Sequence, residues 1–133
     1  MAQITPREKV TVLIVNDEED TRFVLKNLLD HWEYQPIIAR DANEALEILR
    51  KHTPLVVLSD IEIPGINGLQ LLQIIKQQYP QVPVIMMSGR GTAEEDAKRS
   101  LELGAFQFIP KPFDLKYLRQ VLSAVQLFSR PCL

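Results

Sequence analysis

The sequence is poor in cysteine and glycine, and it lacks any apolar run long enough to cross a membrane. Its single cysteine, Cys132, excludes a disulfide within the chain, so a reducing, cytoplasmic environment is expected. The first nine residues contain no apolar stretch of signal-peptide length. A large charge of one sign is also missing, because 15 Lys and Arg stand against 17 Asp and Glu. We therefore expect neither membrane insertion nor direct binding of nucleic acid through a basic face.

The composition is that of a folded protein. Of the 133 residues, 46% are hydrophobic and 24% are charged, which excludes a wholly disordered chain. This length fits one domain and leaves no room for a second domain of ordinary size. We expect a single domain over residues 1–133, with a core from about 10 to 128 and flexible ends at 1–9 and 129–133.

Short β-rich segments alternate with longer segments of helical periodicity. Strands are predicted at 10–15, 35–39, 55–59, 82–87 and 105–109, and helices at about 19–32, 41–51, 68–79, 92–103 and from 114 to just before Pro131. Two helix starts have a capping-box pattern, Asp41 with Glu44 and Thr92 with Glu95, and Gly104 fits a left-handed helix stop. The alternation predicts an α/β protein in which helices cover both faces of a five-stranded parallel sheet.

Polar residues follow the predicted strands. Asn16 and four acids at 17–20 come after the first strand, and Asp60, Ser88 and Lys111 follow later ones. In open parallel sheets these positions meet at one edge, where ligands bind. Four successive acids repel phosphate, which argues against a nucleotide-binding loop, and they favour a hard cation such as Mg²⁺. The sequence has no motif typical of a zinc site or of an acyl-transfer nucleophile.

Four motifs follow the predicted strands in order: V-L-I-V-N-D-E-E-D at 12–20, S-D-I-E-I-P-G-I-N-G-L at 59–69, V-I-M-M-S-G at 84–89 and G-A-F-Q-F-I-P-K-P-F at 104–113. Together they resemble the receiver domain of bacterial two-component response regulators, a group that includes the chemotaxis regulators. The resemblance implies a flavodoxin-like, three-layer (βα)5 sandwich with strand order 2-1-3-4-5. It also implies a regulatory phosphoacceptor that assists its own phosphotransfer and dephosphorylation, rather than an enzyme.

The resemblance assigns roles to the residues at the sheet edge. Asp60 would accept a phosphoryl group from a sensor histidine kinase or a phosphotransfer protein, and Ser88 and Lys111 would contact that group. Mg²⁺ would be bound by Asp17, Asp60 and the backbone carbonyl of Glu62. Plainer interpretations exist for each side chain: a turn or cap for the Asp and Ser residues, and a surface charge for the Lys.

The resemblance further makes Ser88 and Phe108 the switch residues. On phosphorylation they would reshape the surface of the fourth helix, fifth strand and fifth helix, to which a partner or a second copy could bind. Phe108 is equally well explained as a core residue. Pro112 is the candidate for a cis peptide bond. Glu62 and Arg90 could pair across the mouth of the site, or be two unrelated surface charges.

The sequence departs from the family at Asn16, where receivers usually have an acid. An amide can hold a metal-bound water but supplies no charge, so weaker Mg²⁺ binding or slower phosphotransfer is expected. Two alternatives remain open, a non-phosphorylated pseudo-receiver that serves as an interaction module, and the N-terminal receiver of a longer transcriptional regulator. A flavodoxin-like or phosphatase-like enzyme is disfavoured, because neither the phosphate loop nor the D-x-D motif follows the first strand.

Overall fold

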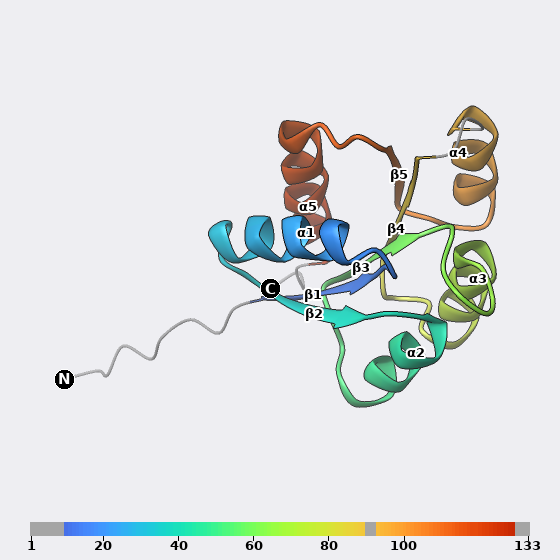
Figure 1. Cartoon of the computed structure of the whole chain (residues 1–133). Helices are drawn as coiled ribbons and strands as arrows, with labels where there is room; N and C mark the ends of the chain where they lie inside the picture. The colour runs from blue at the N-terminus through green and yellow to red at the C-terminus, as the bar shows by residue number, and fades with distance from the viewer. Residues whose placement is uncertain (1–9, 90–92, 130–133) are drawn as a thin grey trace.

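The computed structural model describes residues 10–89 and 93–129, and within them five strands alternate with five helices. The strands are β1 (Val10–Val15), β2 (Tyr34–Ala39), β3 (Val56–Asp60), β4 (Val84–Ser88) and β5 (Gln107–Pro110). The helices are α1 (Glu19–His31), α2 (Ala42–Lys51), α3 (Gly68–Gln78), α4 (Ala93–Glu102) and α5 (Leu115–Ser129). All strand pairs are parallel, in the order β2-β1-β3-β4-β5, which confirms the predicted fold and strand order (Figure 1).

The sheet is covered on both faces. Figure 1 shows α1 and α5 on one side of the sheet and α2, α3 and α4 on the other. Val12 and Ile14 of β1 pack in the core beneath α1 and α5, whereas Leu13 and Val15 pack in the core on the opposite face. Successive side chains of a strand point to opposite faces, so a strand segment that packs against helices on both faces is mostly apolar. None of the helices in the described residues is long and apolar enough to span a bilayer.

Three strands extend one residue further than predicted. β3 includes Asp60, β4 includes Ser88 and β5 includes Pro110, where ends at 59, 87 and 109 were expected. The backbone N–H of Ile61 donates to the carbonyl of Met87 at 3.0 Å, so the hydrogen-bond ladder continues past Asp60. The side chain at position 60 is therefore held by a strand rather than by a loop.

Two strands also begin two residues later than predicted. The N–H of Val82 donates to the carbonyl of Tyr79 at 3.0 Å and Pro83 has no N–H, so neither residue donates to the β4 ladder. The N–H of Ala105 donates to the carbonyl of Ser100 at 2.9 Å, which closes the end of α4 instead of opening β5. The N–H groups of Val82 and Ala105 are hydrogen-bonded within local turns, so they do not take part in the sheet.

The helix starts follow capping rules with one displacement. The side chain of Asp41 accepts from the Glu44 N–H at 2.8 Å, as predicted. The carboxylate of Glu44 accepts from the N–H of Arg40 rather than from that of Asp41, so the reciprocal half of the box is shifted by one residue. Thr92, which was expected to cap α4, lies outside the described residues.

The start of α3 has a capping box that was not predicted. Asn67 accepts from the Gln70 N–H, and the Gln70 side chain accepts from the Asn67 N–H, each at 2.9 Å. The spacing N-x-x-Q before an apolar run was the available signal. At the end of α4, Gly104 has φ of 101°, which confirms the predicted left-handed stop.

Candidate functional site

Asp60 lies at the end of the central strand β3 and is only 4% exposed. Three donors surround its carboxylate. The Lys111 ammonium lies 2.5 Å from Oδ2, the side-chain amide of Asn16 donates to the same oxygen at 3.3 Å, and the Glu62 N–H donates to Oδ1 at 3.1 Å. These donors come from loops after β1, β3 and β5, so the predicted meeting of the strand ends at one edge is observed.

Asn16 is fully buried and its amide orientation is determined by its neighbours. Its side-chain oxygen accepts from the Glu18 N–H at 2.7 Å, which leaves the NH₂ group to face Asp60. Its backbone carbonyl accepts from the Arg22 guanidinium at 2.9 Å. The amide therefore offers Asp60 a hydrogen-bond donor at the position where the resemblance led us to expect an acid.

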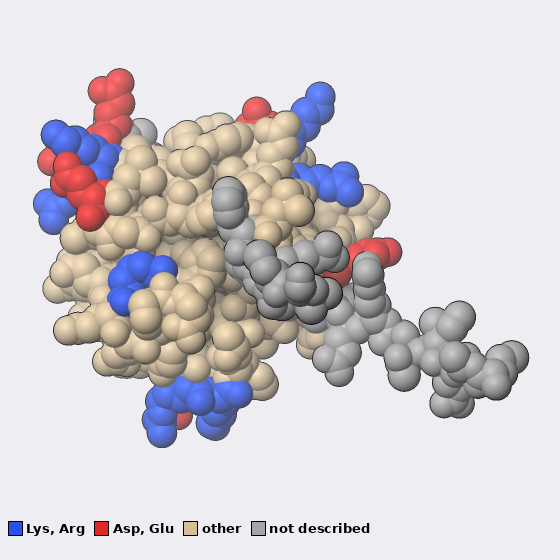
Figure 2. Space-filling model, turned by 180° about the vertical axis from the view of Figure 1, so that it is seen from behind, with Lys and Arg blue, Asp and Glu red and all other residues tan. Residues whose placement is uncertain are grey.

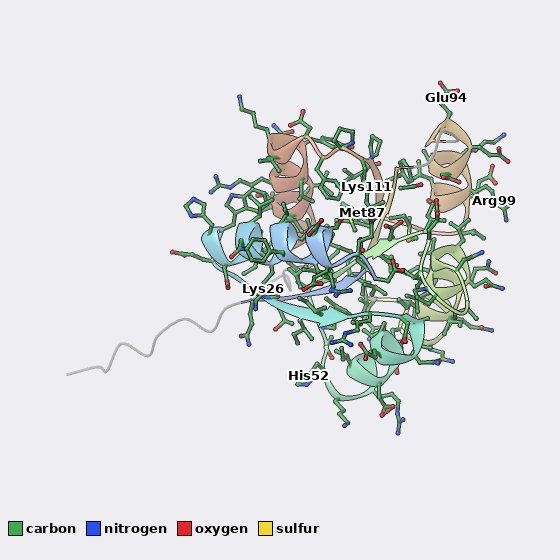
Figure 3. The ribbon with its side chains drawn as sticks, viewed as in Figure 1. Lys26, His52, Met87, Glu94, Arg99 and Lys111 are labelled. Carbon is green, nitrogen blue, oxygen red and sulfur yellow. The ribbon has the colours of Figure 1, made fainter. Side chains whose placement is uncertain are left out.

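Lys111 is positioned by its backbone on both sides. The Lys111–Pro112 peptide bond is cis, as predicted, and the Lys111 N–H donates to the Ser88 carbonyl at 2.9 Å. The Lys111 side chain packs against Gly89, directly after β4, and Figure 3 shows it well apart from His52, which follows α2. The ammonium also contacts the Glu18 carboxylate at 3.3 Å. It thus bridges a buried carboxylate and an exposed one.

The pKa of Lys111 is raised above its ordinary value of 10.5. Burial alone would lower the pKa, but hydrogen bonding and charge from Asp60 and Glu18 outweigh burial. The folded state therefore favours the ammonium. This contribution to stability is complete below the pKa of the unfolded chain and is lost as the pH rises through the higher folded-state pKa.

We expect Asp60→Asn to lower the pKa of Lys111, because burial remains while its main ion partner is removed. Glu18→Gln should lower the pKa of Lys111 less, since Glu18 raises this pKa less than Asp60 does. An NMR titration of the Lys111 side chain in the three proteins measures this order. A Lys111 titration that is the same with and without the Asp60 carboxylate would contradict it.

The donor set beside Asp60 fits Mg²⁺. A cavity of about 540 Å³ is lined by Asp17, Glu18, Asp60, Glu62, Gly89 and Lys111. Within residues 10–89 and 93–129, no group of three His, Cys, Asp or Glu side chains is arranged to hold a metal. Mg²⁺ commonly takes only one or two carboxylates and keeps several waters, and the Asp17 and Asp60 carboxylates that line the cavity are of this kind and number.

The Ser88 hydroxyl donates to the Asp96 carboxylate of α4 at 3.1 Å. Ser88 and Asp96 are 1% and 3% exposed. Sequence reasoning did not select Asp96. The available signal was its place on the inner face of α4, one turn before the buried Ser100.

The structure says less about the roles of the other residues that the sequence singled out. Phe108 is 6% exposed and packs in the core on the α2, α3 and α4 side of the sheet. Arg90, the suggested partner of Glu62, lies outside the described residues. Glu18 was named only as one of the four acids at 17–20, and its ion pair with Lys111 was not predicted.

Comparison with known protein sequences points to one family. The family model for the response regulator receiver domain matches residues 12–123. A "Putative response regulator NtrX-like" of Rickettsia conorii is 40% identical over 126 residues, and the "DNA-binding transcriptional regulator NtrC" of Klebsiella pneumoniae is 40% identical over 102. These matches cover 93% and 77% of this chain but 25% and 22% of the relatives. The chain thus spans about a quarter of the length of these curated relatives.

Solved structures agree. The receiver domain of NtrX from Brucella abortus is 36% identical with a TM-score of 0.81, and the match covers 86% of this chain and 96% of that one. The signal receiver domain of an HD domain-containing protein from Pseudomonas fluorescens is 29% identical with a TM-score of 0.84, covering 92% and 98%. With the fold, the strand order and the family model in agreement, this chain belongs to the response regulator receiver domain family.

Proposed function

We propose that this domain is a phosphorylation-activated switch in which Asp60 accepts a phosphoryl group from a sensor histidine kinase or a phosphotransfer protein. The observation that carries the proposal is the arrangement around the Asp60 carboxylate. One oxygen faces the Lys111 ammonium and the other faces the Glu62 N–H, at the wall of a cavity that Asp17 also lines. This is a nucleophile with positive charge and hydrogen-bond donors already in place.

The chemistry is a simple displacement at phosphorus. A carboxylate oxygen of Asp60 bonds to phosphorus, the bond from phosphorus to the donor imidazole breaks, and an acyl phosphate results. The Lys111 ammonium lies beside the phosphoryl oxygens and offsets their negative charge. Asp17, Asp60 and the Glu62 carbonyl would hold Mg²⁺, which supplies further positive charge there when bound. Asn16, whose NH₂ group faces Asp60, would take part in Mg²⁺ binding only through a metal-bound water.

The test uses a small phosphodonor. Incubation with acetyl phosphate and Mg²⁺ should add the mass of one phosphoryl group, and mass spectrometry after reductive trapping should locate it at Asp60. Beryllofluoride, which mimics an acyl phosphate, should shift NMR signals around the same residue. If neither reagent changes the protein, the proposal is wrong.

Asn16→Asp should strengthen Mg²⁺ binding. The substitution replaces the amide NH₂ that lies 3.3 Å from Asp60 with a second carboxylate. Two like charges at this separation repel each other and attract a cation, so we expect Mg²⁺ to bind at least about tenfold more tightly. Without Mg²⁺ the variant should be less stable than the wild type, for the same reason.

Calorimetric Mg²⁺ titration and urea unfolding measure the two effects of Asn16→Asp. Asn43→Asp on α2 is the matched control, because it adds the same charge at an exposed position away from Asp60. Equal Mg²⁺ affinity in the wild type and Asn16→Asp would show that the amide does not weaken the site.

A pseudo-receiver is the second candidate, and Asn16 is the observation that favours it. The side-chain amide of Asn16 donates a hydrogen bond to the Asp60 carboxylate, which gives this carboxylate a partner that is not a metal ion. The acetyl phosphate experiment separates the two candidates, since a pseudo-receiver remains unmodified.

The proposal extends to the context of the domain. The curated relatives are about four times longer, so we infer that residues 1–133 act as one receiver domain at the N-terminal end of a longer regulator in the cytoplasm. The proposed output surface is formed by α4, β5 and α5, and it would bind a partner or a second copy on phosphorylation. Acidic and basic side chains are intermixed at the corner formed by α4, which contains Glu94, Lys98, Arg99 and Glu102 (Figure 2).

A further inference from the structure

Asp96 is a buried carboxylate outside the proposed phosphorylation site. It lies in the first turn of α4, is 3% exposed, and accepts a hydrogen bond from the Ser88 hydroxyl at 3.1 Å. A charge in the interior is tolerated only with polar partners, and this hydroxyl is one of them. The two residues are eight positions apart, so the hydrogen bond ties the start of α4 to the end of β4.

The inner face of α4 offers little else to hold the helix. Its fully or nearly buried side chains among the described residues include Asp96 and Ser100, and Ala97 is partly buried. In the neighbouring helix α3 the corresponding surface consists of apolar side chains, Leu71, Leu72 and Ile75 among them. Since burial of apolar area is the main stabilising contribution, the position of α4 depends more on polar contacts than that of α3 does.

Ser88 is also connected to Asp60. Its carbonyl accepts the Lys111 N–H at 2.9 Å, and the Lys111 ammonium contacts the Asp60 carboxylate. A Cβ at Gly89 would lie 3.3 Å from the Lys111 side chain, so the segment after Ser88 packs directly against that lysine. The contacts therefore run without a gap from Asp60 through Lys111 and Ser88 to Asp96.

A serine hydroxyl has one proton and can donate it to one acceptor at a time. We propose that Asp96 is a positioning residue that holds the Ser88 hydroxyl in the unphosphorylated domain and competes with the phosphoryl group for its proton. The inference rests on the proposed function of Asp60. Phosphorylation then exchanges one acceptor for another, and the first turn of α4 loses this hydrogen bond to β4. Asp96 thereby sets how easily the active arrangement forms.

The test is the affinity for beryllofluoride, measured by NMR titration at constant Mg²⁺. Removing the competing acceptor by Asp96→Ala should tighten binding about tenfold, as expected for one hydrogen bond to a charged group. Asp96→Asn retains a weaker, neutral acceptor and should give an intermediate affinity. Glu94→Gln is the matched control, because Glu94 is in the same turn of α4, is exposed, and points away from Lys111 (Figure 3). It should bind like the wild type.

The same substitution in a Ser88→Ala background separates competition from a structural effect. Without the hydroxyl there is nothing to compete for, so Asp96→Ala should no longer change the affinity. An equal gain in both backgrounds would overturn the inference, as would an Asp96→Ala domain that binds beryllofluoride no more tightly than the wild type. If Asp96→Ala does not fold, Asp96→Asn replaces it in both backgrounds with the same required outcome. Failure of the wild type to bind would instead overturn the proposed function.

Discussion

Asp60→Asn is expected to abolish phosphoryl transfer to this domain. The amide has almost the same shape as the carboxylate but is a poor nucleophile, and no acyl phosphate can form on it. It also removes the charge that pairs with the Lys111 ammonium in a site where Asp60 is 4% exposed. Transfer from acetyl phosphate should fall below detection, measured by mass spectrometry over the time in which the wild type is fully modified.

Asp30→Asn is the matched control for this experiment. It makes the same chemical change at an exposed position near the end of α1 and should leave phosphorylation unchanged. Modification of Asp60→Asn at the wild-type rate would mean that another residue is the acceptor. Asp17→Asn then tests the neighbouring acid directly.

The largest expected effect on folding is that of Gly68→Ala. Gly68 is the first residue of α3, and a Cβ there would lie 2.1 Å from the backbone oxygen of Asp60 and 2.8 Å from the Cα of Ile61. Both are backbone atoms, so no side-chain rotation relieves the overlap. The Gly68 N–H also donates to the Ile61 carbonyl at 2.7 Å, which holds the two segments together.

We expect Gly68→Ala to lower the free energy of unfolding by on the order of 3 kcal/mol or more, at the upper end of overpacking effects. Because the displaced backbone is that of the acceptor residue, phosphorylation at Asp60 should be impaired as well. Urea unfolding followed by circular dichroism measures the first effect and acetyl phosphate labelling the second.

Gly65→Ala distinguishes steric overlap from backbone strain. Gly65 has φ of 79°, but a Cβ there meets nothing within 4 Å. It should therefore cost only about 1–2 kcal/mol, the penalty for placing an L-residue in the left-handed region. If Gly68→Ala is no more destabilising than Gly65→Ala, the close approach of α3 to β3 is not rigid.

The order of elements was predictable because each is encoded locally. The part of β1 that is buried on both faces, Val12 to Val15, is apolar throughout, and an amphipathic helix repeats its apolar residues every three or four positions. The errors in the strand ends came from donors used by turns, as at Val82 and Ala105. A backbone N–H that bonds within a turn instead of within the sheet leaves the pattern of apolar residues unchanged. That pattern therefore could not reveal where these strands begin.

The edge of the sheet was also predictable, since parallel strands bring their carboxyl ends together and four motifs mark those ends. The cis bond before Pro112 was expected from one of these motifs and is present. The roles of Asp60, Ser88 and Lys111 in phosphorylation stay predictions. What the motifs could not show is which side chain each of these residues contacts.

The α/β fold and the strand order implied by its motifs followed from the sequence alone, and so did the expectation that polar residues gather at the edge of the sheet beside Asp60. Only the tertiary structure decided that Asn16 turns its NH₂ toward Asp60, that Glu18 shares Lys111, and that Ser88 donates to Asp96. The reason is physical. Periodicity reports which face of an element is buried, whereas the partner of a hydrogen bond depends on distances and angles that exist only after separate elements have packed together.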